Sequence, residues 1–335
     1  MHQQKNRITL CLNGRDEPTA LYQVPRLRTP PWTINGHVHT ICSSFFGNTR
    51  KPPHKRIEID TPDNDFLELD VVRFDNTKPV IVLFHGLEGS TSRYYMTELM
   101  NALQTFKYSV IAVNFRSCGS RLNHQKRFYH SGETKDPLTV FRWARKNFPS
   151  RKLFATGFSL GSNVLLKSLG ELGSEHPVDA AVGISTPYDL KEGSRALSRG
   201  FNQVYDKLFV LTLTQKVRAK RKKYPDIPKF DGTTLYEFDD QITSKIHGFR
   251  DAEDYYEQCS SRHFIKNIKK PTLLIHSKQD PLCPYHSVPL HKIEQNNYTD
   301  IIATNEGGHV GFWSKPYGWL NRTIVNFFNR LVNMD

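Results

Sequence analysis

Short, unbroken runs of apolar residues recur along the chain and predict buried β-strands. Five stand out, at 80–84 (VIVLF), 110–113 (VIAV), 153–156 (LFAT), 180–184 (AAVGI) and 272–275 (TLLI). Such runs suit strands that are covered on both faces, as in parallel sheets. Helix-like segments separate them; one begins at Pro137, with Asp136 as its expected N-cap. This alternation predicts an α/β fold with a mostly parallel, doubly wound sheet.

Three regions depart from the alternation. Residues 1–55 carry several prolines and glycines and show no sustained hydrophobic periodicity, so we expect an N-terminal extension packed on the core. Apolar positions flank a turn cluster within 57–72 and predict a β-hairpin at a sheet edge. Residues 187–261 have helical periodicity and contain no convincing buried strand, which predicts a helical cap. This cap would interrupt an α/β core formed by 56–186 and 262–335.

Composition narrows the class of protein. The 335 residues are 38% hydrophobic and 12% aromatic, enough for a sizeable core, and this excludes a disordered chain. No stretch approaches the ~18 apolar residues of a membrane span, and no apolar signal core follows the first residues. The five cysteines are scattered and form no C-x-x-C pair, which favours a reducing, cytoplasmic setting: Cys11, Cys42, Cys118, Cys259 and Cys283. The net charge of +13 suits nucleic acid, an anionic membrane or an acidic substrate, and does not choose among them.

Residues 157–161 read GFSLG and match the pattern G-x-S-x-G. A strand-like run precedes them, and apolar positions at helical spacing follow. Strand, sharp turn and helix form the context that a nucleophile elbow requires. We therefore expect Ser159 to be a nucleophile whose hydroxyl projects from a strained turn; an ordinary turn rich in small residues is the alternative.

A serine hydroxyl needs a base to take its proton, and in this fold the acid and then the histidine follow the serine. His309 lies between glycines in the loop 306–312 and is the candidate base. Asp280 follows the predicted strand 272–275 and is the candidate acid, placed to accept a hydrogen bond from the imidazole. Two other acids remain as rivals: Asp300 and Glu306.

The oxyanion of an acyl-transfer intermediate needs two preorganised backbone donors. The amide of Leu160, directly after the nucleophile, is the first candidate. The second is expected in the loop 85–90 (HGLEGS), where the amide of Leu87 is the best candidate because Gly86 lets the backbone turn its N–H inward.

Seven segments spread over residues 32–313 carry a resemblance to a known family. They are 35–41 (NGHVHTI), 85–90, 114–119 (NFRSCG), 129–134 (YHSGET), 157–161, 255–256 (YY) and 307–312 (GGHVGF). With these the chain resembles the YheT-type α/β-hydrolases, a group that also includes mammalian abhydrolase-domain lipases and yeast medium-chain ester enzymes. The resemblance implies Ser159, Asp280 and His309 as the triad, and hydrolysis of carboxylic esters. Two positions depart from the family pattern, which usually has glycine at Ser117 and Ser162.

Two family-like segments carry no chemistry that the residues define. His37 and His39 lie two apart and could suggest a metal, but no carboxylate or cysteine cluster completes a ligand set, so a structural role is favoured. His130 and Asp136 are six residues apart, which differs from the H-x4-D pattern of acyltransferases.

The leading function is therefore a serine esterase acting on short- or medium-chain acyl or lipid esters, with no metal and no cofactor required. One alternative is a non-catalytic hydrolase-like module that binds a membrane surface or a partner through its basic cap; another is an acyltransferase with the same triad. Residues 209–213 and the Lys/Arg run 216–223 would form either a solvated helix face or an amphipathic element that contacts anionic lipid. No aromatic-interleaved basic surface favours nucleic acid.

Overall fold

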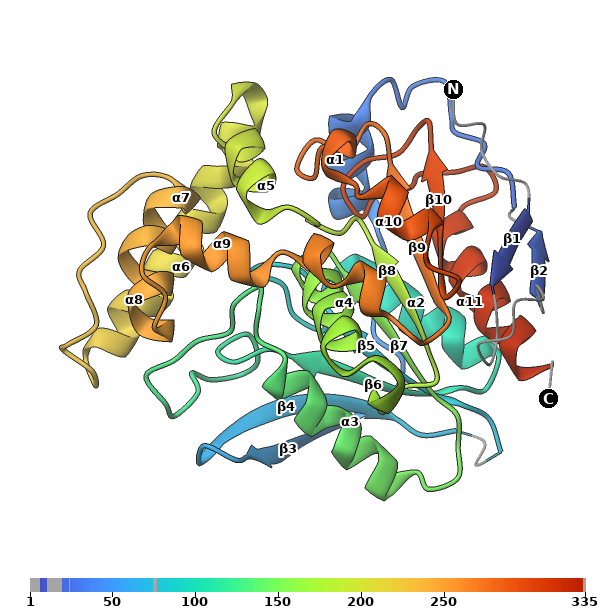
Figure 1. Ribbon diagram of the computed structural model, residues 1–335, viewed down its shortest axis with the longest axis horizontal. Helices are drawn as coiled ribbons and strands as arrows, with labels where there is room; N and C mark the ends of the chain where they lie inside the picture. The colour runs from blue at the N-terminus through green and yellow to red at the C-terminus, as the bar shows by residue number, and fades with distance from the viewer. Residues whose placement is uncertain (1–6, 11–19, 24, 75–76, 334–335) are drawn as a thin grey trace.

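An eight-stranded sheet forms the centre of the molecule (Figure 1). The structure is a computed structural model, and it describes residues 7–10, 20–23, 25–74 and 77–333. In spatial order the strands are β10 (Thr299–Thr304), β9 (Thr272–Ser277), β8 (Ala180–Ile184), β7 (Leu153–Phe158), β5 (Val80–Phe84), β6 (Ser109–Asn114), β4 (Asp65–Val72) and β3 (Lys55–Thr61). The six strands from β10 to β6 are parallel, whereas β3 and β4 form an antiparallel hairpin at the edge. The predicted α/β fold, its five buried strands and the edge hairpin are confirmed.

Helices cover both faces of the sheet, and each face has its own apolar core. On one face α2 (Tyr94–Thr105) and α11 (Trp319–Val332) pack against the strands, with Phe328 stacked on Phe154 at 4.9 Å between ring centroids. On the other face lie α3 (Lys135–Asn147), α4 (Leu160–Leu172) and α10 (Leu290–Glu294). This three-layer arrangement buries the all-apolar strands on both sides, as their sequence predicts.

The stretch between β8 and β9 contains helices and no strand, and every one of its residues is described. Its α-helices gather at the left of Figure 1: α5 (Leu190–Leu197), α6 (Gln203–Arg221), α7 (Leu235–Phe238), α8 (Ser244–His247) and α9 (Ala252–Cys259). A π-helical turn, η3 (Asp239–Thr243), joins α7 to α8. The division of the chain into a core and an inserted cap stays a prediction.

The N-terminal region contains regular elements that the sequence analysis did not anticipate. The strands β1 (Arg7–Leu10) and β2 (Ala20–Gln23) pair antiparallel, and α1 (Gly36–Phe46) follows. The side chain of Asn35 caps α1 by accepting from the amide of Val38 at 3.0 Å. Cys11 lies outside the described residues; the four described cysteines are free thiols.

None of the described helices combines the length and the apolar character needed to cross a membrane.

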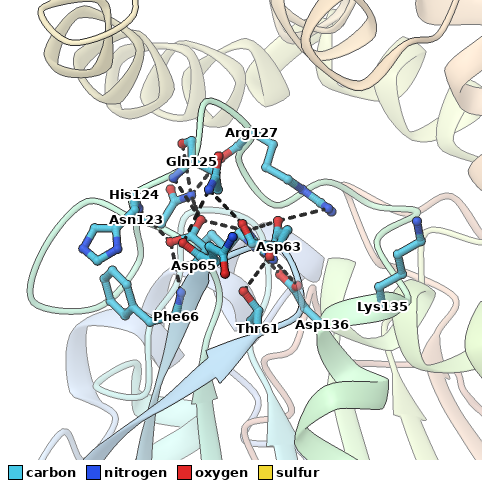
Figure 2. A network of polar contacts seen from close by, with 12 residues as sticks. Thr61, Asp63, Asp65, Phe66, Asn123, His124, Gln125, Arg127, Lys135 and Asp136 are labelled. Atoms are coloured by element: carbon cyan, nitrogen blue, oxygen red, sulfur yellow. Dashed lines mark hydrogen bonds and ion pairs between the residues drawn. The ribbon is translucent and has the colours of Figure 1, made fainter.

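A buried arginine ties the edge hairpin to the rest of the sheet. The guanidinium of Arg116, two residues after β6, donates to Asp63 in the β3–β4 turn, to Asp65 at the start of β4 and to Asp136 in α3, at distances between 2.7 and 3.0 Å. The three carboxylates converge with the loop 123–127 in Figure 2. The expectation that Asp136 caps α3 is wrong, because Thr134 holds the N-cap position and the Asp136 carboxylate turns inward to the guanidinium.

Candidate active site

Ser159 occupies a sharp turn between β7 and α4. Its φ of 53° lies in the left-handed region, which a residue with a side chain adopts only under strain. Glycines make the turn possible: a Cβ on Gly157 would lie 2.6 Å from the carbonyl oxygen of Gly161, and one on Gly161 would lie 2.5 Å from that of His85. The strand and the helix therefore approach closely on either side of the serine, as a nucleophile elbow requires.

The three polar side chains singled out in the sequence meet at this turn. His309 Nε2 lies 2.8 Å from Ser159 Oγ, and His309 Nδ1 lies 3.0 Å and 3.1 Å from the two Asp280 carboxylate oxygens. The amides of Leu282 and Cys283 both donate to Asp280 Oδ1. Burial opposes ionisation of Asp280, yet His309 and these donors hold its pKa below the ordinary value.

The two rival acids do not reach the histidine. Asp300 lies in the first half of β10 and accepts from the amide of Ile301. The Glu306 carboxylate accepts from the hydroxyl of Thr29 at an exposed position. Asp280 is the acid that the structure places against the imidazole.

The predicted oxyanion donors lie beside the serine. Gly86 is so close to Ser159 that a Cβ on it would come within 3.0 Å of the serine Cβ. Leu87 and Leu160 line the same cavity as Ser159. Within the described part of the chain, neither of their amides has a protein acceptor, so both are free to donate to a bound oxygen.

Helix α1 braces the loops that carry the acid and the base. Thr40 Oγ1 accepts from the amide of His309 at 2.9 Å and donates to the carbonyl of Gly36 at 2.7 Å. The start of α1 also presses on the loop before Asp280, since a Cβ on Gly36 would lie 1.8 Å from the Gln279 carbonyl oxygen. Residues 35–40 thus position the site, a role that their sequence did not reveal.

We expect Thr40→Val to lower kcat for ester hydrolysis about 10-fold and to leave KM nearly unchanged, because the loss of the hydroxyl frees the His309 loop without touching the substrate. Steady-state kinetics with p-nitrophenyl butyrate measures both constants. Ser44→Ala, one turn along the same helix, removes a hydroxyl that donates only to the Thr40 carbonyl and should keep wild-type kcat. Equal kcat in wild type and Thr40→Val would contradict the bracing role.

The histidines of α1 do not converge on a common point. His37 Nδ1 contacts the Tyr205 hydroxyl at 3.2 Å, whereas His39 Nδ1 accepts from the amide of Trp313 at 3.2 Å. In the described chain one group of three side chains lies close enough to share a metal ion: Asp280, Cys283 and His309. Burial keeps the pKa of the Cys283 thiol well above its ordinary value, and the carboxylate and imidazole already bind each other, so this group is a poor ligand set.

The two departures from the family pattern have local explanations. Ser162 is buried, and its hydroxyl lies 2.5 Å from that of Thr186, in space that Gly183 leaves open. A serine side chain at this position therefore fits without crowding the start of α4. Ser117 has a φ of 62°, a conformation that favours glycine, and its hydroxyl donates to the Asn123 side chain at 2.6 Å.

A cavity of about 110 Å³ opens onto Ser159 and His309. One wall comes from the core and includes Leu87 and Tyr129, and the other comes from α5–α9. Helix α6 contributes Phe209 and Leu213 to this second wall. The lining is mainly apolar, as acyl-chain binding requires. Sequence reasoning could not assign Phe209 and Leu213 to the cavity, because no motif marks them.

One carboxyl group lines this cavity without a cation beside it in the described structure. Asp239, in η3, accepts from the hydroxyls of Thr243 at 2.7 Å and Tyr256 at 2.9 Å. Burial raises its pKa from 3.8 to about 7. Because the folded state favours the protonated form, this group makes the protein less stable as pH rises from about 4 to about 7.

Asp239→Asn should therefore gain stability relative to wild type as pH increases, by up to roughly 4 kcal/mol between pH 4 and pH 8. Urea unfolding at these two pH values measures the difference. Asp226→Asn is the control, since Asp226 pairs with Lys126 at the surface and its pKa is shifted downward. A constant difference between Asp239→Asn and wild type across this range would show that the carboxyl is not perturbed by burial.

Comparison with known proteins agrees with this architecture. A family model described as alpha/beta hydrolase fold matches residues 79–316. The chain belongs to the α/β-hydrolase family.

Sequence relatives narrow the group within that family. YheT of Escherichia coli (strain K12), a candidate esterase by its name, is 36% identical over 308 residues, covering 88% of this chain and 90% of that one. Human phospholipase ABHD3 is 27% identical over 320 residues, covering 90% and 78%. The monoacylglycerol lipase of Saccharomyces cerevisiae is 27% identical over 305 residues, covering 87% and 66%. The YheT-type resemblance is confirmed.

Solved structures share the fold at low identity. The Pyrococcus furiosus esterase Pf2001 aligns with a TM-score of 0.54 at 18% identity, covering 93% of this chain and 97% of that one. The ferulic-acid complex of Est1E from Butyrivibrio proteoclasticus aligns with a TM-score of 0.56 at 13% identity, covering 83% and 98%.

Proposed function

We propose that the protein is a serine esterase that cleaves carboxylic esters of acyl chains, with Ser159, His309 and Asp280 as its catalytic triad. The observation that carries the proposal is the continuous hydrogen-bonded line from Ser159 Oγ through the imidazole to the buried Asp280 carboxylate. At its Ser159 end this line opens into an apolar cavity, where an acyl chain would be removed from water.

The geometry suits an acyl-enzyme mechanism. Ser159 Oγ attacks the ester carbonyl carbon while His309 Nε2 takes its proton, and Asp280 holds the imidazole tautomer and stabilises the imidazolium. The amides of Leu87 and Leu160 donate to the oxyanion. His309 protonates the leaving alcohol, and a water molecule, deprotonated by the same imidazole, then hydrolyses the acyl-enzyme.

The names of the relatives support ester substrates with acyl chains. A phospholipid and a monoacylglycerol both carry a carboxylic ester on a long apolar chain, and the mainly apolar cavity would take such a chain. We therefore extend the proposal to short- or medium-chain acyl esters and lipid esters. A series of p-nitrophenyl esters of increasing chain length would locate the optimum.

Labelling with a fluorophosphonate, followed by mass-spectrometric mapping of the modified peptide, tests the nucleophile. We expect the adduct on Ser159 and none on Ser162, which lies one helical turn away but is hydrogen-bonded to Thr186. An unlabelled protein that also fails to hydrolyse p-nitrophenyl butyrate would favour the non-catalytic alternative. Ester exchange exceeding hydrolysis in the presence of an acceptor alcohol would favour acyl transfer.

A further inference from the structure

The molecule exposes large apolar side chains in one region to an unusual extent. On α6 and the turn before it, Phe201, Val204, Leu208 and Leu211 are each about half exposed, at 53%, 47%, 56% and 54%. Ile34, directly before the cap of α1, is 75% exposed. Single exposed leucines are ordinary, but a contiguous apolar patch on a protein surface marks an interaction site.

The two segments lie side by side. The His37 ring of α1 lies 4.9 Å from the Phe201 ring and stacks on Tyr205 at 5.9 Å. We call Ile34, Phe201, Val204, Leu208 and Leu211 the outer face. At the other end of α1, Phe45 and Phe46 are 79% and 72% exposed; they lie outside the outer face as defined here.

Helix α6 presents cations on the same side as its exposed leucines. At 100° per residue, positions 204, 207, 208, 211, 218 and 222 fall within an arc of about 100°. Lys207, Arg218 and Lys222 in this arc are exposed and, across the described chain, make no ion pair. The one acid of α6, Asp206, is buried and accepts from the amide of Leu235. The outer side of α6 is therefore apolar toward its N-terminus and positively charged toward its C-terminus.

The opposite side of the same helix serves the cavity. Phe209 and Leu213 line it, and Lys216 reaches across to donate to Glu88 at 2.7 Å, next to the predicted oxyanion donor Leu87. Lys220 donates to backbone carbonyls of the loop 125–127. The sequence predicts that residues 209–213 and the Lys/Arg run 216–223 form a single outward face. This expectation is revised, because many of these side chains point toward the cavity and the loop 125–127 instead.

We propose that the outer face, together with Lys207, Arg218 and Lys222, docks the enzyme on the surface of an anionic lipid bilayer. Apolar side chains flanked by cations, with no acid between them, match an interface of acyl chains and anionic headgroups. Because α6 also lines the cavity, docking would place the substrate pocket next to the lipid. This inference rests on the proposed esterase function.

Vesicle sedimentation tests the docking. Wild-type protein should bind phosphatidylglycerol/phosphatidylcholine vesicles at low salt, bind pure phosphatidylcholine vesicles more weakly, and lose affinity at high salt. The double variant Leu208→Ser/Leu211→Ser should bind at least about 10-fold more weakly, from the burial of two leucine side chains. Lys207→Gln/Arg218→Gln should weaken binding to the anionic vesicles only.

Phe106→Ser is the matched control, because Phe106 is 45% exposed at the end of α2, outside the outer face. Hydrolysis of the water-soluble ester p-nitrophenyl butyrate should be unchanged in all these variants, which separates failure of docking from failure of catalysis. The proposal would be overturned if wild-type protein did not bind anionic vesicles, or if Leu208→Ser/Leu211→Ser bound them as tightly as wild type. A dimer that Leu208→Ser/Leu211→Ser dissociates in sedimentation equilibrium would also overturn it, by assigning the face to a second copy of the chain.

Discussion

Ser159→Ala is expected to lower kcat/KM toward p-nitrophenyl butyrate by a factor of about 10⁴ or more. The variant keeps the cavity and both proposed oxyanion donors but has no oxygen for the imidazole to activate. Loss of the serine or of the histidine alone costs nearly as much as loss of the whole triad, since these members act as a unit. We therefore expect Ser159→Ala and the double variant Ser159→Ala/His309→Ala to share the same residual rate.

Ser162→Ala provides the control for this prediction. Ser162 lies in the first turn of α4, and its hydroxyl bonds Thr186 rather than the imidazole. Its loss should affect stability and spare kcat. If Ser159→Ala retained a tenth of wild-type activity while Ser162→Ala abolished it, the assignment of the nucleophile would be wrong.

The sequence predicts the elbow because all of its determinants are local. Residues 153–172 contain the strand run, the two glycines, the serine and the helical stripe, and no distant contact is needed to recognise them. His309 and Asp280 are found less directly, through the order of acid and base that the fold imposes. What the structure adds is that Asp280 contacts the His309 imidazole, which in turn reaches Ser159 Oγ.

The parts that escaped prediction depend on contacts between distant segments. Thr40 bonds the amide of a residue 269 positions later, and nothing in its neighbourhood signals this. The cavity wall formed by α6 could not be predicted either. Phe209 and Leu213 are spaced like the apolar residues on the buried face of any helix, so nothing marks them as cavity residues. Local rules predict that Asp136 caps a helix. Its carboxylate instead accepts a hydrogen bond from a buried arginine twenty residues earlier in the chain, Arg116.

Arg116→Met is expected to lower the free energy of unfolding by about 3–5 kcal/mol, a large loss for a single substitution. The side chain of Arg116 is 1% exposed and is the shared partner of Asp63, Asp65 and Asp136. Burial opposes ionisation of Asp63, but its bonds to Arg116 and Thr61 hold its pKa at about 2. Removing the guanidinium leaves buried carboxylates without a counter-charge. The free energy of unfolding lost in this way is far larger than the net stabilisation that the intact ion pairs provide.

The matched control is Arg121→Met, in the loop that follows β6. Arg121 is 44% exposed and pairs with the exposed Glu58, so its loss should change the free energy of unfolding by about 1 kcal/mol or less. Urea unfolding at neutral pH measures both variants. Because the Arg116 network also anchors the loop that leads to Tyr129 in the cavity wall, Arg116→Met should raise KM for p-nitrophenyl butyrate even below the unfolding midpoint. Equal unfolding free energies for Arg116→Met and Arg121→Met would mean that the carboxylates find other partners, and that the hairpin β3–β4 does not depend on this arginine.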